Sequence, residues 1–337
     1  MAANANLHKA KNAKNDEFYT QLTDVAKELM HYKHHFKDKI VFCNCDDPTW
    51  SAFWKYFHLN FEALGLKKLI STHYDKTEPT YKMEYTGGDD NDIEVGVKTP
   101  LEGNGDFRNQ ECLDLLDEAD IVVTNPPFSL FREYVACLME HKKKFLIIGN
   151  MNALTYKEIF PLFRDNKLWY GASIHSGDRK FGVPDSYPLD AAGCGIDENG
   201  QRYIKVKGVR WFTNLDYAAR HEKLVLWKKY NSKEYPKYDN YDAINVNKYS
   251  EIPMDYNGVM GVPITFMDFY CPEQFEIVAF RKGEDGKDLV FTRERESSTV
   301  LSYPCTTSIA GMIKNAEGKI NGKPTYARIT IRRKLNR

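Results

Sequence analysis

The stretch Asp120-Ile121-Val122-Val123-Thr124-Asn125-Pro126-Pro127-Phe128 decides the fold of this chain. Its first part is a short continuous apolar run, which is typical of a parallel strand buried on both faces. Its second part, Asn125 to Phe128, is a stiff turn, because proline has a fixed φ and no N–H. A buried strand that ends in such a turn predicts a ligand site at the carboxyl edge of a parallel sheet.

The sequence around this stretch alternates between strand-like and helix-like patterns as far as residue 165. Continuous apolar runs predict buried strands at residues 39–44, 68–73, 120–124 and 144–149. Apolar residues at helical spacing predict helices at residues 22–35, 50–64, 111–118, 130–141 and 156–164. This alternation predicts an α/β fold with a Rossmann-like, mostly parallel sheet that is covered on both faces.

The pattern changes after residue 165. An antiparallel hairpin is predicted from residues 208–214 and 223–230, and the Gly- and Asp-rich residues 81–101 are predicted to form a loop or hairpin insertion. Beyond residue 230 the chain is rich in Tyr, Asn, Pro and Lys, with strand-like pieces at residues 264–266, 275–280 and 328–332. That composition suits a recognition region better than a second enzyme core.

Composition places the chain among soluble globular proteins, with 337 residues, 42% hydrophobic and 28% charged. The length suggests two domains, or one large domain with insertions. No window approaches the roughly 18 apolar residues of a membrane span, and the polar start, Met1 to Lys14, does not resemble a secretory signal. Seven cysteines without a Cys-x-x-Cys motif make structural zinc unexpected and indicate a reducing cytoplasm.

Charge is segregated along the chain, although the net charge is zero. Residues 75–120 hold 14 acidic and 4 basic residues, whereas residues 202–237 hold 10 basic and 3 acidic and residues 281–337 hold 13 basic and 6 acidic. A polyanion-binding face built from the C-terminal half would fit this distribution. The alternative is that these runs are ordinary solvated faces.

The Asn-Pro-Pro-Phe turn suits the chemistry of a planar amino group. The side-chain carbonyl of Asn125 and a proline backbone carbonyl can both accept hydrogens from an amine. The exocyclic amine of adenine is a poor nucleophile because its lone pair is delocalised, and two acceptors favour a pyramidal nitrogen that can attack a methyl sulfonium. Phe128 offers a flat face on which a base could stack. The alternative is an ordinary turn after a strand.

Candidate cofactor residues follow the first two predicted strands. Asp75 ends the second strand, where a carboxylate can grip a ribose, or is simply a turn residue. The first strand leads into Cys43 to Pro48, which contains no glycine and therefore no backbone cradle for a pyrophosphate. This argues against a nicotinamide or flavin cofactor and leaves room for S-adenosylmethionine, which has no phosphate. Asp46 and Asp47 could accept from its amino group, or one of them caps the next helix.

Asp106 and Phe107 are a further candidate pair, since a carboxylate beside an aromatic ring can bind the amino group of an adenine and cover its face. The alternative is an ordinary loop aspartate. Three histidines, His31, His34 and His35, resemble a metal cluster, but they lie at a lysine-rich helix end where histidine suits the helix dipole. No metal is therefore expected. No Walker, kinase or Gly-x-Ser-x-Gly motif is present.

With these residues in place, the chain resembles the adenine-specific DNA methyltransferases of the EcoRI type, which are the modification partners of type II restriction systems. The similar stretches cover most of the first 230 residues in order: KNDEFYTQ (Lys14 to Gln21), YKHHFKDK (Tyr32 to Lys39), CNCDDP (Cys43 to Pro48), GLKKLI (Gly65 to Ile70), ADIVVTNPPFSLFREYV (Ala119 to Val135), KKFLIIGN (Lys143 to Asn150) and VRWFTNL (Val209 to Leu215). Matches of this length are far more specific than the tetrapeptide alone.

The resemblance implies an S-adenosylmethionine-dependent methyltransferase sheet and methylation of the exocyclic N6 amine of adenine in a short duplex DNA site. It assigns the catalytic turn to Asn125, Pro126, Pro127 and Phe128. It assigns cofactor binding to Phe18, Tyr19 and Thr20 at the methionine part, Asn44 and Asp46 in the first turn, Asp75 at the ribose, and Asp106 and Phe107 at the adenine. The first turn departs from the common glycine-rich form, so the choice among residues 44–47 stays open.

The resemblance also implies a division of labour along the chain. Residues 1–230 are expected to bind the cofactor and catalyse, residues 231–337 to recognise the target, and residues 171–205 are a candidate inserted DNA-contacting loop. The target adenine is expected to flip out of the duplex and stack on Phe128. Trp211 and Phe212 are candidates to support its opposite face or, equally, core aromatics of a strand.

The expected partners are double-stranded DNA and a cognate restriction endonuclease that acts on the same site without forming a stable complex. The protein is expected to be a monomer in the cytoplasm, bacterial or phage-encoded, with no metal and no membrane association. GAATTC is the site that the resemblance suggests. Two alternatives stay open: the same turn acting on an RNA adenine or a protein amide, and a catalytically silent DNA-binding module.

Overall fold

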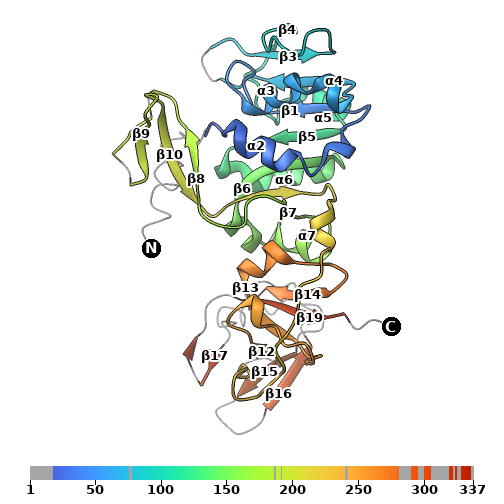
Figure 1. Cartoon of the computed structure of the whole chain (residues 1–337), viewed down its shortest axis with the longest axis vertical. Coiled ribbons are helices and arrows are strands. Elements are labelled where there is room, and N and C mark those ends of the chain that lie inside the picture. Colours follow the sequence, from blue (N-terminus) through green and yellow to red (C-terminus); the bar gives the residue numbers. More distant parts are fainter. Residues whose placement is uncertain are drawn as a thin grey trace. The chain divides into compact units, whose positions relative to one another are not determined.

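The computed structural model divides the chain into two compact units. It describes residues 18–75, 78–185, 187–190, 192–239, 242–280, 290–294, 300–304, 319–321, 323–324 and 328–334. The first unit comprises Met1–Ala153 and Tyr170–Tyr217, and the second comprises Leu154–Trp169 and Ala218–Arg337. Figure 1 labels many of the helices and strands of both.

The first unit is built on an eight-stranded sheet with the strand order β4-β3-β2-β1-β5-β6-β11-β7 (Figure 1). Its centre consists of four parallel strands, β2 (Lys68–Thr72), β1 (Ile40–Cys43), β5 (Ile121–Thr124) and β6 (Lys144–Asn150). Every residue of β1 and β5 is buried, so both faces of the sheet are covered there. The predicted α/β fold with parallel central strands is confirmed, and the sheet as a whole is mixed.

Antiparallel strands flank this parallel centre on both sides. On one side β3 (Tyr81–Tyr85) and β4 (Val97–Pro100) form a hairpin that extends the sheet from β2. On the other side β11 (Val209–Thr213) runs antiparallel to β6 and is followed by the short β7 (Trp169–Tyr170).

The predicted hairpin between residues 208–214 and 223–230 is wrong, because residues 222–230 adopt neither helix nor strand. The partner of β11 is β6 instead. All five residues of β11 are buried, whereas residues 223–230 alternate between exposed and half-buried positions. A strand that is buried on both faces lies in the interior of a covered sheet, and β11 reaches such a position by pairing with β6.

Helices of the first unit pack against this sheet and against each other. α3 contacts β2, α5 contacts β1, α6 contacts β6, and α2 contacts α3. The bounds are α2 (Leu22–Leu29), α3 (Ala52–Leu59), α4 (Phe61–Leu64), α5 (Gln110–Glu118) and α6 (Phe131–Glu140), with 3-10 turns η2 (Lys33–His35), η3 (Phe128–Leu130) and η4 (Met151–Thr155). Ser51 caps α3 by accepting from two backbone N–H groups of its first turn. Gly65, at φ +64°, ends α4 in the left-handed conformation.

A small antiparallel sheet of the first unit stands to one side of the main sheet (Figure 1). It has the strand order β8-β10-β9, with β8 (Asp178–Gly182), β9 (Cys194–Ile196) and β10 (Arg202–Lys207). Tyr19 and Gly182 exchange two backbone hydrogen bonds of 2.8 and 2.9 Å, which join β8 to the segment before α2. Gly171, which precedes this sheet, donates its N–H to the carbonyl of Trp211 at 2.9 Å.

The second unit contains a four-stranded sheet of its own, with the order β12-β13-β19-β14. Its elements are α7 (Phe160–Arg164), η5 (Ala218–His221), β12 (Ile244–Asn245), η6 (Tyr249–Glu251), β13 (Met260–Pro263), η7 (Ile264–Phe269), β14 (Phe275–Phe280), β15 (Val290–Glu294), β16 (Val300–Pro304), β17 (Lys319–Ile320), β18 (Lys323–Pro324) and β19 (Arg328–Arg333). The predicted strands at residues 275–280 and 328–332 are confirmed. The strand predicted at residues 264–266 is wrong, because these residues form the 3-10 turn η7.

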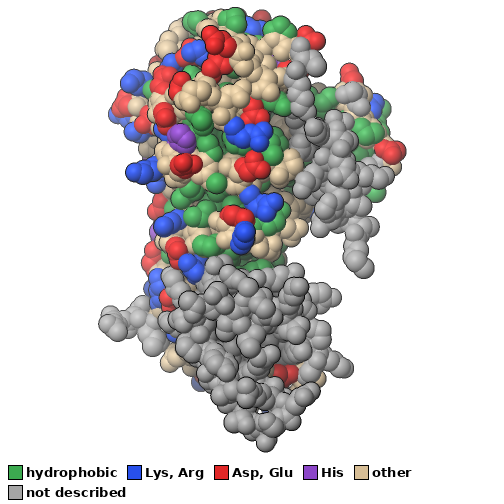
Figure 2. Space-filling view, turned by 180° about the vertical axis from the view of Figure 1, so that it is seen from behind, with side chains coloured by type: hydrophobic (Ala, Val, Ile, Leu, Met, Phe, Trp, Pro, Cys, Tyr) green, Lys and Arg blue, Asp and Glu red, His purple; other side chains and the backbone are tan. Residues whose placement is uncertain are grey.

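Acidic and basic side chains are interspersed on the described part of the face shown in Figure 2. Within the acidic run of residues 75–120, Glu84 pairs with Lys68 and Lys82, and Asp106 pairs with Arg108. Charges that are segregated along the sequence therefore meet opposite charges in the fold. Over the described ranges, no helix is both long and apolar enough to cross a membrane.

Candidate active site

Three segments meet at one edge of the sheet because β1, β2 and β5 are parallel neighbours and end on the same side. They are residues 44–47 after β1, residues 73–75 after β2, and residues 125–128 after β5. The loop 103–109 joins them, since Asp75 donates its N–H to the carbonyl of Asn104 at 3.2 Å. The sequence predicted these segments from separate strands, and the structure brings them together.

The Asn125 side chain is fixed at one end and free at the other. Its Nδ2 donates to the backbone carbonyl of Phe18 at 2.5 Å, and its backbone N–H donates to Oδ2 of Asp46 at 3.4 Å. Its Oδ1 is buried and accepts no hydrogen bond in the described part of the chain. A buried acceptor without a donor costs about 1 to 3 kcal/mol. This oxygen is the kind of group that a ligand N–H would satisfy.

Asp46 lies behind the Asn-Pro-Pro-Phe turn and is almost completely buried. Its carboxylate accepts from Thr124 Oγ1 at 2.5 Å, from Ser51 Oγ at 3.2 Å and from the N–H of Asn125. Burial raises the pKa of Asp46 to about 7, although these three donors oppose the rise. Asp46 therefore ties the end of β1 to the end of β5.

Asp47 accepts several hydrogen bonds at the same edge. The ring of His73 lies 2.9 Å from Oδ2, and the Tyr81 hydroxyl donates to Oδ1 at 2.7 Å. Thr49 donates both its N–H and its hydroxyl to Oδ1, at 2.9 and 2.8 Å. Burial raises the pKa of Asp47, but the bonds from His73, Thr49 and Tyr81 outweigh burial and hold it well below its usual range. Neither Asp46 nor Asp47 caps α3, because Ser51 does so.

Asn44 and Cys45 complete the turn after β1. The buried Asn44 accepts from Thr72 Oγ1 at 3.1 Å, and its backbone carbonyl accepts from the hydroxyl of Thr124. Cys45 adopts φ +64°, a left-handed conformation that glycine usually takes. The turn thus keeps a left-handed bend although it contains no glycine.

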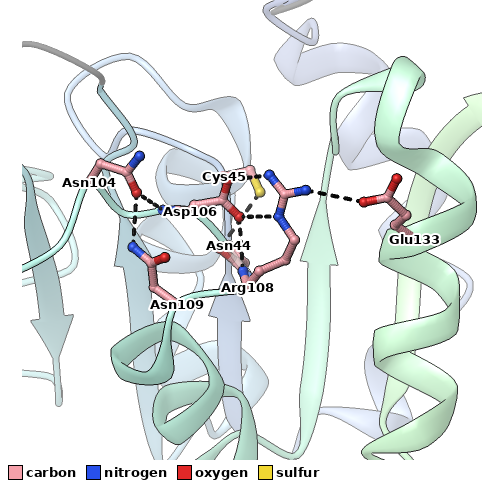
Figure 3. Close-up of polar contacts among 7 residues, drawn as sticks. All are labelled: Asn44, Cys45, Asn104, Asp106, Arg108, Asn109 and Glu133. Carbon is pink, nitrogen blue, oxygen red and sulfur yellow. Dashed lines mark hydrogen bonds and ion pairs between the residues drawn. The ribbon is translucent and has the colours of Figure 1, made fainter.

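The loop that carries Asp106 is held by its own polar contacts (Figure 3). Arg108 grips the Asp106 carboxylate with two bonds of 2.9 and 2.6 Å and also reaches Glu133 at 3.2 Å. The hydrogen bonds from Arg108 lower the pKa of Asp106. Gly105, at φ +73°, approaches the carbonyl of His73 so closely that a Cβ atom would clash.

The remaining cofactor candidates line the same edge or lie beneath it. Phe107 is buried and packs edge-on against Tyr134, with ring centroids 4.9 Å apart. Asp75 is half-buried, and its Oδ1 accepts from the N–H of Glu78 at 3.0 Å, as in an ordinary turn. Thr20 carries a second buried acceptor, because its Oγ1 has no hydrogen-bond partner within the described ranges.

Four aromatic rings form a cluster at the Asn-Pro-Pro-Phe turn. Phe18 lies edge-on to Phe128 with centroids 5.8 Å apart, and it also contacts Phe181 at 5.9 Å and Tyr187 at 6.4 Å. Phe128 and Phe181 are perpendicular at 6.5 Å. Only the Phe128 ring of the four is half-buried rather than buried. The outer ring of this cluster is therefore the one next to Asn125.

Phe181 and Tyr187 were missed by the sequence analysis, which treated residues 171–205 only as a candidate DNA-contacting loop. The signal that could have found them is the alternation Phe181-Gly182-Val183, in which both side chains that flank the glycine are apolar. The strand β8 carries Phe181 to the site because its neighbour Gly182 pairs with Tyr19.

Trp211 and Phe212 belong to the interior of the sheet. Both side chains are 0% exposed, so no face of either ring is open to a ligand. Trp211 packs edge-on against Phe53, and Phe212 packs against Phe131 and Tyr170. This placement fits the second interpretation given with them, that of core aromatics. No group of three His, Cys, Asp or Glu side chains among the described residues is arranged to hold a metal ion.

Comparison with known proteins matches nearly the whole chain. A family model described as "Adenine-specific methyltransferase EcoRI" matches residues 6–334. Type II methyltransferase M.EcoRI of Escherichia coli is 51% identical over 302 residues, which is 86% of this chain and 93% of that protein. Type II methyltransferase M.MpnI of Mycoplasma pneumoniae (strain ATCC 29342 / M129 / Subtype 1) is 38% identical over 334 residues, 98% of each chain. No solved structure matches the chain.

Proposed function

Because the chain belongs to the family of EcoRI-type adenine-specific methyltransferases, we propose that it methylates the exocyclic N6 amine of adenine in a short, specific site of duplex DNA. The methyl donor in this proposal is S-adenosylmethionine, and the catalytic residues are Asn125, Pro126, Pro127 and Phe128. The observation that supports it most is the buried Oδ1 of Asn125, an oriented acceptor to which none of the described residues donates.

The residues at the sheet edge fit S-adenosylmethionine. The edge offers the half-buried carboxylate of Asp75, and the turn after β1 contains no glycine to form a phosphate cradle. Thr20 adds a buried hydroxyl oxygen that has no hydrogen-bond partner among the described residues. The residues proposed to hold it are Phe18, Tyr19, Thr20, Asn44, Asp46, Asp75, Asp106 and Phe107. S-adenosylmethionine, when bound, supplies an electrophilic methyl group on a sulfonium.

The chain's own contribution is to orient the target amine. Asn125 Oδ1 and the backbone carbonyl of Pro126 accept the two amine hydrogens, which moves the nitrogen towards a pyramidal shape and frees its lone pair. Once methylated, the amine would be cationic, and its surplus proton would leave to water along the hydrogen bonds to Asn125 Oδ1 and the Pro126 carbonyl. The hydrogen bonds from Asn125 to Phe18 and Asp46 fix the turn in advance, so little reorganisation is needed.

The target base must leave the duplex to reach this turn. We propose that the half-buried ring of Phe128 receives it, since the buried rings of Phe18 and Phe181 pack against Phe128 and hold it in place. Trp211 and Phe212 have no exposed face and serve the core instead.

The wider organisation is part of the same proposal. Residues 1–230 form the cofactor-binding and catalytic part, residues 231–337 form the target-recognition region, and residues 171–205 contact DNA beside the site. The partners are double-stranded DNA and a restriction endonuclease that acts on the same sequence without a stable complex. The protein works as a monomer in the cytoplasm, in keeping with its bacterial relatives.

Asn125→Ala tests the catalytic assignment. Methyl transfer to duplex DNA should fall by about 100- to 1,000-fold, as expected when one preorganised polar contact to the reacting group is lost. Binding of S-adenosylmethionine, measured by calorimetry, should stay within about threefold. Retained methyl transfer would refute the role of Asn125.

Sequencing of modified bases in DNA from cells that express the wild-type protein tests the substrate. N6-methyladenine at one recurring site is the expected result. Methylation of RNA or of protein without modified DNA would refute the proposed substrate.

A further inference from the structure

Residues Lys223 to Tyr230, here called the lysine–tryptophan segment, belong to the second unit and lie outside its helices and strands. Both backbone groups of Leu224 bond to the side chain of Gln274 at 2.8 Å. The carbonyl of Lys228 accepts from the N–H of Met254 at 2.8 Å. The segment is therefore anchored along one side, through its even-numbered residues.

The side chains of the even-numbered residues reinforce this anchoring. Lys228 lies 3.6 Å from carboxylate oxygens of both Glu234 and Glu251. The ring of Tyr230 packs on that of Tyr256, with centroids 4.7 Å apart. These contacts hold the segment in one position, so its outward side chains are presented in a fixed order.

The odd-numbered residues face solvent in the order Lys223, Val225, Trp227 and Lys229. Val225 is 86% exposed and Trp227 is 64% exposed, the two most exposed large hydrophobic residues of the second unit's described part. Neither lysine has an ion-pair partner among the described residues. Leaving a tryptophan and a valine in water forgoes the stabilisation of burial, so their joint exposure marks an interaction surface.

The chemistry of this surface favours a polyanion with flat apolar faces. Two unpaired lysines flank an aliphatic and an aromatic side chain. Six residue steps separate Lys223 from Lys229, so their Cα atoms are at most about 20 Å apart. Lysines at this spacing can reach phosphates on either side of a groove, while apolar side chains between them meet sugars and base edges.

A second copy of the chain suits the surface less well. Two such segments could pair antiparallel about Leu226 through their free backbone edges. Lys223 of one copy would then lie opposite Lys229 of the other at both ends of the pair, and like charges in facing positions destabilise a strand pair. DNA meets the same lysines with negative charge.

We propose that Lys223, Val225, Trp227 and Lys229 form a contact surface for the duplex DNA substrate, with the lysines on phosphates and Trp227 wedged against sugars and base edges. This inference rests on the proposed function only in taking duplex DNA as the partner. The surface contributes affinity and not chemistry, because it contains none of the catalytic or cofactor-binding residues.

The test is fluorescence anisotropy with the full-length protein and a short labelled duplex, containing GAATTC or a scrambled sequence, at several salt concentrations. Trp227→Ala should weaken binding of both duplexes by about tenfold, whereas Trp227→Phe, which keeps a flat ring, should bind within about threefold of wild type. The double variant Lys223→Ala/Lys229→Ala should reduce the slope of log affinity against log salt by about 1.8.

Val97→Ala and Lys33→Ala serve as matched controls, since both side chains are exposed on the first unit. Both should bind DNA like the wild type. Wild-type affinity of Trp227→Ala would overturn the proposal. A concentration-dependent dimer that is lost in Trp227→Ala, with DNA binding unchanged, would overturn it in favour of a second copy. Failure of the proposed function would show separately, as a wild-type protein that binds duplexes but transfers no methyl group to them.

Discussion

The catalytic turn and the lysine–tryptophan segment use aromatic side chains in opposite ways. At the turn, Phe18 and Phe181 are buried behind Phe128, and the neighbouring Asn125 is fixed by two hydrogen bonds. On the segment, Trp227 projects into solvent from a backbone that is anchored only on its other side. Groups that must act on a reacting atom are held in place by neighbouring residues, whereas groups that only add affinity can be exposed on the surface. Substitutions at the turn should therefore change the rate of methyl transfer, whereas substitutions on the segment should change the affinity for DNA.

The largest contrast should appear between two tryptophans, Trp211 and Trp227. Trp211→Ala should lower the free energy of unfolding by about 3 to 5 kcal/mol, because it leaves a cavity in a strand buried on both faces. Trp227→Ala should change it by less than about 0.5 kcal/mol, because that ring is mostly in water already. Urea unfolding of both variants measures the difference. Equal losses would mean that Trp227 is a structural residue and would remove the contrast.

Asp46→Asn should give the next largest effect, which is a pH-dependent difference in the free energy of unfolding between the variant and the wild type. The pKa of Asp46, about 7 in the fold, lies above the value near 3.9 of an exposed aspartate. Asp46 therefore stabilises the fold most at low pH, and this contribution is lost as the pH rises through 7. Asparagine does not titrate, so the stability of the variant relative to wild type should rise by about 2 to 3 kcal/mol between pH 5 and pH 8.

Urea unfolding at the two pH values provides the measurement for Asp46→Asn. The lysine–tryptophan segment supplies the matched comparison, because the side chain of Lys229 is exposed whereas that of Asp46 is buried. Lys229→Ala should show a stability difference from wild type that does not change with pH. A pH-independent difference for Asp46→Asn as well would show that Asp46 ionises normally and that its burial has no energetic consequence.

Phe128→Leu should give the smallest of these effects and sharpen the division between chemistry and affinity. Loss of the flat ring should lower kcat/KM for methyl transfer by about tenfold, because the target base loses its stacking surface. On a duplex in which the target adenine is replaced by an abasic site, the variant should bind like the wild type. Trp227→Ala should weaken binding to that abasic duplex as well. If Phe128→Leu also weakened it, Phe128 would act as a general DNA contact.

The sequence predicted the features that depend on local pattern. The apolar runs before Asn44, before Asp75 and before Asn125 are strands, and parallel pairing brings their ends to one edge. The position of Asn125 at this edge could be predicted from the strand that precedes it, without knowledge of the residues that surround Asn125 in the fold.

The features that the sequence could not predict depend on pairing between distant segments. Residues 209–213 and 223–230 both contain apolar residues and a tryptophan, yet only the first range pairs with β6. Phe181 reaches the site through the bond between Tyr19 and Gly182, for which the sequence holds no local signal. The grip of Arg108 on Asp106 was likewise hidden, since proximity in sequence does not fix where two side chains point.

The hydrogen bond between Gly171 and Trp211 has an evolutionary consequence. The chain leaves the main sheet and returns to it at one place, so residues 172–208 form an excursion with adjacent ends. Residues 172–208 can be replaced or lengthened as a unit, because the strand pairing of the main sheet does not depend on the residues between β7 and β11. Phe181 and Gly182 limit that freedom, since they reach back to Phe128 and Tyr19. If residues 172–208 change in the course of evolution, Phe181 and Gly182 must be kept, or the rate of methyl transfer will change.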